Sequence, residues 1–126
     1  MTVQADLKRL QGEWVIVSAK TGEPNRDAMA TGAWIRFDGN TWQQFNVAGN
    51  QETGMRPFKL RPKENPKEID FLRDQKTIQM RGIYVFEKDQ LKFCWGPDRD
   101  SPRPKDFKGG GKDQIRVFVL ERKKKV

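Results

Sequence analysis

The side chains that most often carry catalysis are scarce in this 126-residue chain. It contains no histidine, which removes the commonest general base near neutral pH, the commonest metal ligand and every histidine-containing triad. Its single cysteine, Cys94, stands between Phe93 and Trp95 on a predicted strand. A nucleophilic thiol needs a neighbouring base and an electropositive setting. The sequence supplies no such base, so we expect a packed or outward-facing, unreactive thiol.

The acidic residues form no recognisable metal site or acid–base pair. Asp98 and Asp100, like the acidic residues between Glu64 and Asp74, alternate with basic residues that compete for their charge. Neither the spacing of a calcium loop nor a cysteine cluster occurs. The glycine run before Lys112 lacks the strand, spacing and helix of a phosphate-binding loop. We therefore predict that the protein is not an enzyme, with no catalytic residues, no metal and no cofactor.

Aromatic residues are the remaining resource, with eight Phe, four Trp and one Tyr. Alternate residues of a strand share a face, so the rings of each strand gather on one side. Two interpretations stay open. Either the rings fill the interior, or some line a pocket at the open end of the fold, opposite Trp14, for a small, mainly apolar ligand, with polar contacts from Ser18, Gln44, Tyr84 or Arg116. The predicted lining of such a pocket is Ile16, Phe58, Tyr84, Phe93 and Phe118.

These side chains need a β-sheet to position them, and eight short apolar or alternating runs predict its strands. Asp38-Gly39 between two aromatic runs is a hairpin signal. Single helical turns are predicted at Asp6–Leu10 and Arg26–Ala30. A closed barrel is favoured over a sandwich because closure removes edge strands, which this chain does little to protect. The predicted strands are Gly12–Ala19, Ala33–Asp38, Thr41–Val47, Met55–Leu60, Glu68–Leu72, Thr77–Glu87, Gln90–Trp95 and Gln114–Arg122.

The step from Leu10 through Gly12 to Trp14 is the most informative local motif, because glycine gives backbone latitude where the first strand begins and tryptophan brings the largest apolar side chain. Further motifs follow it in a fixed order. The ordered set resembles a bacterial lipocalin-like domain family of unknown function, expanded in planctomycetes. The later motifs are Pro66–Phe71, Gly82–Phe86, Leu91–Trp95, Arg103-Pro104, Phe107 and Val119–Arg122.

The resemblance covers about residues 7–122 and implies a fold rather than an activity. It implies a single domain over residues 1–126: an all-β, eight-stranded, mainly antiparallel lipocalin-like barrel with a basic tail at residues 123–126. It also implies structural roles for Gly12, Trp14 and Arg122, in which Arg122 packs across Trp14 and closes the base of the barrel. A cation over an indole contributes about 0.5–2 kcal/mol.

The net charge of +8 is concentrated in the second half of the chain. Residues 1–60 hold 7 Lys and Arg against 6 Asp and Glu, whereas residues 61–126 hold 18 against 11. We expect any affinity for nucleic acid to be weak, non-specific and salt-sensitive, and to depend on this half and on Lys123–Lys125. Two alternatives to a small-ligand binder stay open: a solid barrel that binds a protein partner through its surface, and a weak nucleic-acid binder.

The sequence also carries indications of location. No apolar run approaches the roughly 20 residues of a membrane-spanning helix. The segment Met1–Asp6 has neither a basic nor an apolar signal region, so we expect no export signal. A single cysteine excludes an intramolecular disulfide and fits a reducing compartment. We therefore expect a cytoplasmic protein.

Overall fold

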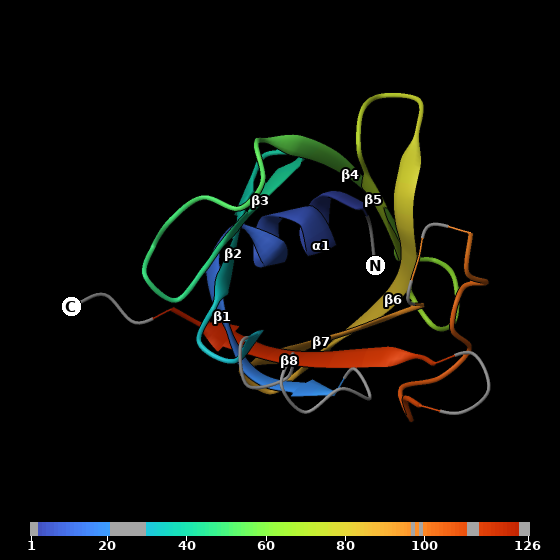
Figure 1. The fold of residues 1–126 in the computed structure, drawn as a ribbon. Coiled ribbons are helices and arrows are strands. Elements are labelled where there is room, and N and C mark those ends of the chain that lie inside the picture. Colours follow the sequence, from blue (N-terminus) through green and yellow to red (C-terminus); the bar gives the residue numbers. More distant parts are fainter. Residues whose placement is uncertain (1–2, 21–29, 97, 99, 111–113, 124–126) are drawn as a thin grey trace.

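The computed structural model describes residues 3–20, 30–96, 98, 100–110 and 114–123, and shows a closed β-barrel with one helix (Figure 1). Each strand pairs with the next along the chain, and β8 returns to pair with β1. All eight pairings are antiparallel, which confirms the predicted eight-stranded barrel. The elements are α1 (Val3–Leu10), β1 (Gly12–Lys20), β2 (Trp34–Asp38), β3 (Thr41–Phe45), β4 (Arg56–Arg61), β5 (Glu68–Leu72), β6 (Ile78–Glu87), β7 (Gln90–Trp95) and β8 (Arg116–Arg122).

The N-terminal helix is longer than the single turn predicted from the sequence. Short helices gain most of their stability from packing, which a local pattern does not reveal. Leu10 is fully buried, and the side chain of Gln11 donates a hydrogen bond to the carbonyl of Leu7 at 3.0 Å. The helical turn predicted at Arg26–Ala30 lies, except for Ala30, outside the described residues. Among the described residues, no helix has the length and apolar character needed to cross a bilayer.

A β-bulge in β1 changes which side chains face the interior. Trp14 and Ile16 are buried, but the pairing of β1 with β8 shifts between Ile16 and Ser18. A bulge inserts one residue and so exchanges the two faces of the strand beyond it. The next core residue is therefore Ala19. The prediction that Ser18 offers a polar contact to the interior is wrong.

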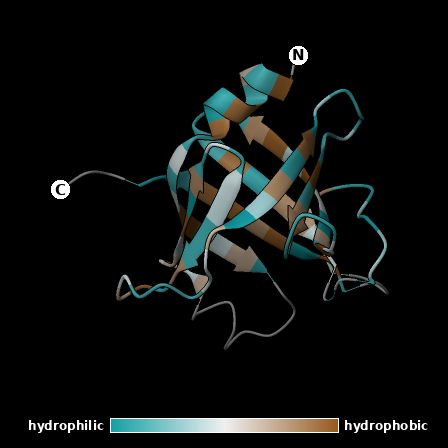
Figure 2. Ribbon diagram, turned by 90° about the horizontal axis from the view of Figure 1, so that it is seen from above, coloured by the Kyte–Doolittle hydropathy of each residue, from teal (hydrophilic) through white to brown (hydrophobic). Residues whose placement is uncertain are grey.

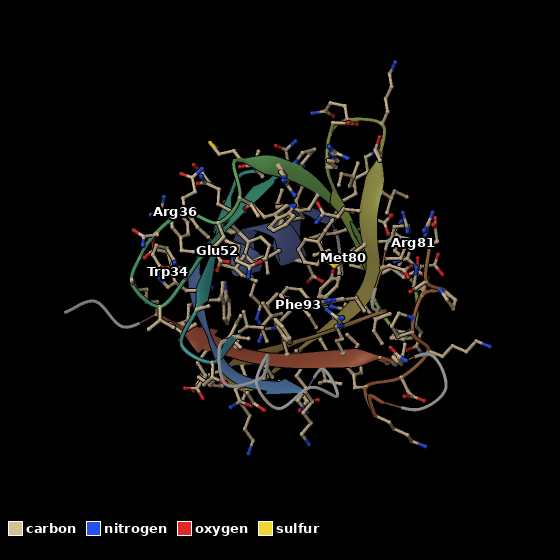
Figure 3. All side chains as sticks on the ribbon, in the orientation of Figure 1. Trp34, Arg36, Glu52, Met80, Arg81 and Phe93 are labelled. Atoms are coloured by element: carbon tan, nitrogen blue, oxygen red, sulfur yellow. The ribbon has the colours of Figure 1, made fainter. Side chains whose placement is uncertain are left out.

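The core is built from aromatic rings that contact one another edge to face. Phe71 lies near its middle, with ring centroids 5.1 Å from Trp42, 5.5 Å from Phe93 and 6.0 Å from Trp95. Figure 3 shows Phe93 and Met80 inside the barrel and Trp34, Arg36 and Arg81 outside it. The buried core cluster is Leu10, Trp14, Ile16, Ala19, Ala33, Ile35, Phe37, Trp42, Phe58, Leu60, Ile69, Phe71, Tyr84, Leu91, Phe93, Trp95, Phe118 and Leu120.

The two ends of the barrel are built differently. Helix α1 lies across the end at which β1 begins and β8 finishes, which we call the closed end (Figure 2). The connections from β3 to β4, from β5 to β6 and from β7 to β8 lie at the opposite end, which we call the open end (Figure 2). The functional question is therefore what each end presents to solvent.

Candidate functional site

The five residues predicted to line an interior pocket lie together in the core, but they are packed rather than arranged around a space. Their exposed fractions run from 0% for Ile16 and Phe93 to 9% for Phe118. A cavity large enough for a ligand would leave accessible surface on the side chains that line it. Phe58 contacts the ring of Phe37, and Phe118 contacts that of Trp95 at 4.6 Å between centroids. The structure thus favours the interpretation in which rings fill the barrel.

The closed end is held by Trp14 and Arg122, two of the three residues with an expected structural role. The guanidinium carbon of Arg122 lies 4.2 Å from the centroid of the Trp14 ring. Trp14 Nε1 donates to the carbonyl of Leu10 at 2.8 Å, and Arg122 donates to the carbonyls of Arg9 and Gln11. These carbonyls belong to the end of α1 and the residue after it, where helical partners are missing. The pair therefore fixes the helix to the barrel.

Gly12, the third residue with an expected structural role, allows this approach. Its φ of +109° is one that residues with a Cβ rarely adopt. A Cβ at this position would also lie 3.0 Å from Nη1 of Arg122. Burial and the neighbouring charge of Arg9 lower the pKa of Arg122. Glycine at the start of β1 therefore leaves room for the Arg122 side chain and also adopts a backbone conformation that would strain other residues.

A buried polar cluster gives α1 a second attachment to the barrel. Asp6, on the helix, accepts hydrogen bonds through Oδ2 from the hydroxyl of Tyr84 at 2.7 Å and from Nζ of Lys67 at 2.9 Å. Its other oxygen, Oδ1, is buried without a partner in the described structure. Burial and the hydrogen bond to Asp6 raise the pKa of Tyr84. Tyr84, predicted as a ligand contact, therefore serves the closed end instead.

The open end carries polar side chains at inner-face positions of the barrel. In the strand register, Gln44 lies opposite Ile35, Arg56 opposite Trp42 and Arg116 opposite Trp95. All three opposite residues belong to the core, and directly paired residues share a face. Gln44 and Arg116 are polar contacts predicted from the sequence. Arg56 was missed, although its alternation with Phe58 is a signal that could have found it.

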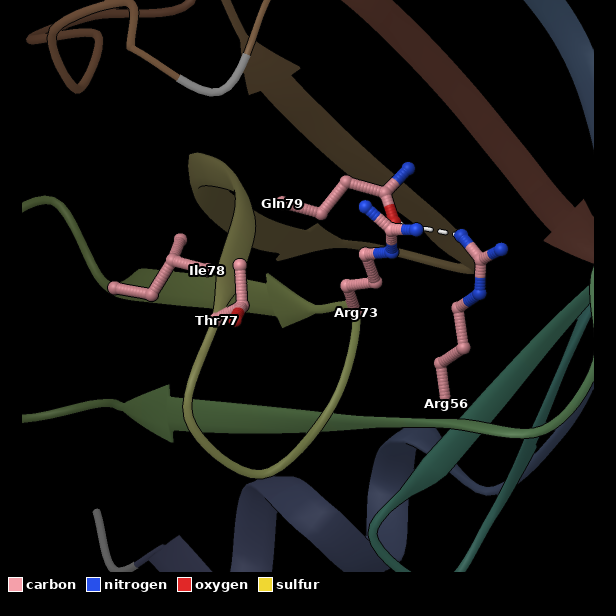
Figure 4. A pocket seen from close by; sticks show the side chains of 5 residues that line it. All are labelled: Arg56, Arg73, Thr77, Ile78 and Gln79. Atoms are coloured by element: carbon pink, nitrogen blue, oxygen red, sulfur yellow. Dashed lines mark hydrogen bonds between the residues drawn. The ribbon is translucent and has the colours of Figure 1, made fainter.

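Arg56 lies in a pocket at this end with a volume of about 310 Å³, lined also by Arg73, Thr77, Ile78 and Gln79 (Figure 4). Nη1 of Arg56 donates to Oε1 of Gln79 at 2.6 Å. Figure 4 shows these two side chains pointing toward one another, with the guanidinium of Arg73 beside them. The pocket thus brings together two guanidinium groups, the amide of Gln79 and the apolar side chain of Ile78.

Arg73 is the first residue of the connection between β5 and β6, and its acidic neighbour is already engaged. The carboxylate of Asp74 accepts hydrogen bonds from the backbone N–H groups of Lys76 and Thr77, both at 2.9 Å. These bonds lower the pKa of Asp74, with a further contribution from the charge of Arg73. They also organise the turn, as side-chain oxygens of aspartate commonly do. Asp74 therefore shapes the pocket without forming an ion pair with Arg73 in the described structure.

Three arginines of the barrel wall, Arg36, Arg61 and Arg103, are paired with carboxylates. Arg36 contacts Glu13 at 2.9 Å, and Asp70, which is almost fully buried, contacts Arg61 at 2.8 Å and Arg103 at 2.6 Å. Arg103 also donates to two backbone carbonyls of β5 and β6. The described part of the connection from β7 to β8 is therefore attached to the outer wall.

The arginines of the open end differ from those of the wall. Within the residues that the structure describes, Arg56, Arg73 and Arg116 form no ion pair with a carboxylate, and Nε of Arg116 is buried without a hydrogen-bond partner. Glu52, an acidic residue of the same end, is exposed. A buried donor without an acceptor is costly, most of all on a charged group. We refer to Arg56, Arg73 and Arg116 as the mouth arginines.

Comparisons with known proteins give no match: no family model fits the chain, and no curated protein or solved structure is significantly similar to it. Membership of the lipocalin-like family therefore stays a prediction from the sequence, whereas the eight-stranded antiparallel barrel is observed.

The described residues offer neither a reactive thiol nor a metal-binding cluster at the open end. Cys94 is fully buried in a small outer-wall cluster with Ile83 and Val117, against which Phe107 and Ile115 pack. Burial raises the pKa of the Cys94 thiol to about 12, so it stays protonated near neutral pH. Among the described residues, no three acidic or thiol side chains are placed to hold a metal ion. What the mouth offers is hydrogen-bond donors with positive charge.

A second aromatic feature lies on the outer wall. The rings of Trp34 and Phe45 stack at 4.0 Å, and Arg36 and Lys123 lie over them, with Nζ of Lys123 3.8 Å from the Trp34 centroid. Val47, two residues beyond Phe45, is exposed. Lys123, the first residue of the basic tail predicted from the sequence, is thus placed against the wall. Residues 124–126 lie outside the described residues.

Proposed function

We propose that the protein binds a small organic anion reversibly at its open end, through the pocket formed by Arg56, Arg73 and Gln79. The observation that carries the proposal is the set of mouth arginines without carboxylate partners among the described residues, whereas Arg36, Arg61 and Arg103 on the wall form ion pairs. A guanidinium group presents a rigid fork of N–H donors that matches a carboxylate or phosphate. An anion would supply the acceptors that the described chain does not.

The apolar part of such a ligand would meet a limited surface. Trp95 and Phe118 are among the most exposed rings of the core, at 7% and 9%, and Met80 is only partly buried beside them. The mainly apolar ligand expected from the sequence would find little area to bury here. Charge therefore contributes most of the affinity in this proposal, and the rings contribute contact with a flat body.

Calorimetric titration with benzoate and its neutral analogue benzamide tests the proposal. We expect benzoate to bind and benzamide to bind at least tenfold more weakly, because only the carboxylate forms charge-assisted hydrogen bonds. Arg56→Gln and Arg73→Gln should each weaken benzoate binding about tenfold, equivalent to roughly 1.4 kcal/mol. Lys8→Gln, which removes the same charge from an exposed site on α1, serves as the matched control. Equal binding of benzoate and benzamide, or equal losses in all three variants, would refute the proposal.

The surface-borne alternatives predict different results. Weak nucleic-acid binding spread over the basic second half would fall steeply between about 50 and 200 mM salt and would change little when Arg56 alone is replaced. Binding of a protein partner through the Trp34 and Phe45 wall would be insensitive to benzoate. Titrating single-stranded and duplex oligonucleotides into the protein and its Arg56→Gln variant separates the nucleic-acid alternative from the pocket.

A further inference from the structure

Two of the mouth arginines, Arg56 and Arg116, come from opposite sides of the barrel. Arg56 begins β4 and Arg116 begins β8, and these strands are four positions apart in a closed ring of eight. They are therefore as far from each other as two strands of this barrel can be. Spacing between strands and their usual tilt give such a barrel a backbone diameter of roughly 15 Å. Two long side chains on facing walls can both reach one small molecule.

The two positions share one feature of the strand register. Each arginine is paired across strands with a tryptophan of the core, Arg56 with Trp42 and Arg116 with Trp95. Trp95, the cross-strand partner of Arg116, also contacts the ring of Phe118 at 4.6 Å between centroids. Arg56 and Arg116 thus occupy inner-face positions on facing walls, each next to a core tryptophan in the strand register.

We infer that the ligand of this end is a flat organic dianion, with one acidic group held by Arg56 and the second held by Arg116. The inference rests on the proposed function and adds the second anchor. The observation behind the second anchor is Nε of Arg116, a buried donor that lacks an acceptor in the described structure. A single anionic group at Arg56 would leave that donor unpaired. A second acidic group on the far side of the ligand would pair with the charge of this guanidinium group through its terminal N–H groups.

Terephthalate is a suitable probe because its two carboxylates project from opposite edges of one ring. The control is 4-carbamoylbenzoate, which has the same shape and one carboxylate replaced by a neutral amide. In calorimetric titrations at low salt we expect terephthalate to bind at least tenfold more tightly than this control. Each charge-assisted hydrogen-bonding group contributes about that factor or more.

Variants then assign the second carboxylate to Arg116. Arg116→Gln should reduce terephthalate affinity to that of 4-carbamoylbenzoate and change the affinity of the monoanion less than twofold. Arg56→Gln should weaken both ligands, and Lys8→Gln should weaken neither beyond the small effect of net charge. Circular dichroism and the thermal midpoint establish that each variant is folded. Arg116→Lys, which keeps the charge and loses the fork, should retain part of the difference between the two ligands.

The outcomes separate this inference from the proposed function. If both ligands bind equally well and Arg116→Gln changes neither, the second anchor is refuted and the single-anion site stands. If neither ligand binds, the proposed function is refuted together with the inference. If terephthalate binding is tighter but unaffected by Arg116→Gln, the second carboxylate is held elsewhere and the inference is wrong.

Discussion

The two ends of this barrel use the same pair of residues in different ways. A tryptophan lies opposite an arginine in neighbouring strands at the closed end, Trp14 with Arg122, and twice at the open end. At the closed end the arginine covers the indole and donates to carbonyls at the end of α1. Among the described residues, neither arginine of the open-end pairs covers its tryptophan or meets a helix.

The difference shows that the cross-strand pair is not in itself structural. The role of the pair depends on whether another part of the chain supplies hydrogen-bond acceptors for the arginine. Where α1 supplies acceptors, the guanidinium of Arg122 holds the fold together. Among the described residues no carboxylate pairs with Arg56 or Arg116, and under the proposed function these guanidinium groups bind an external anion. We therefore expect variants of the closed end to lower the free energy of unfolding, and variants of the open end to weaken anion binding with little effect on stability.

The largest effect is expected at the buried attachment of α1. Asp6→Ala removes the acceptor of Tyr84 and Lys67 and should lower the free energy of unfolding by about 3 kcal/mol, since an uncompensated buried group is left behind. Asp6→Asn keeps an acceptor oxygen for Tyr84 and should cost less. Urea denaturation measures both variants. A loss below about 0.5 kcal/mol in Asp6→Ala, the range of ordinary surface changes, would show that α1 does not stabilise the closed end.

An intermediate effect is expected from the arginines themselves. Arg122→Gln removes the contact over Trp14 and the bonds to α1, so the free energy of unfolding should fall by about 1–2 kcal/mol. Arg56→Gln and Arg116→Gln should change it by less than about 0.5 kcal/mol. Parallel urea denaturation of the three variants makes the comparison. Similar losses at both ends would mean that the open-end arginines are structural too, contrary to the proposed function.

The smallest effect is a pH dependence that belongs to the closed end alone. The pKa of Tyr84 is raised above its ordinary value of 10.0 by burial and by Asp6, so the folded protein keeps a proton that the unfolded chain releases. Its stabilising contribution is complete below pH 10 and is lost as the pH rises further, by at most about 1.4 kcal/mol per pH unit. Measured between pH 9 and 11, the decline should be shallower in Tyr84→Phe. Arg116→Gln should keep the wild-type decline; a change there would contradict a closed-end origin.

Much of the fold could be predicted because the pattern is local. Alternating aromatic residues and turn signals such as Asp38-Gly39 located all eight strands, most of them to within one or two residues of their observed bounds. The contact between Trp14 and Arg122 was likewise predicted, on the basis of a resemblance. The site was predicted less well. Gln44 and Arg116 were placed correctly on the inner face, while Arg56 was overlooked and Tyr84 was given the wrong partner.

The sequence by itself determined that this chain forms an antiparallel barrel with an aromatic core, because a period of two and frequent turns leave few other ways to bury its rings. Only the tertiary structure decided how α1 is attached at the closed end and which of the described cations are paired with carboxylates. The bulge between Ile16 and Ser18 exchanged two faces of β1, and Asp6 reached Tyr84 across 78 positions of sequence. These long-range contacts form only when the sheet closes and α1 docks against it. Neither event leaves a local pattern in the sequence.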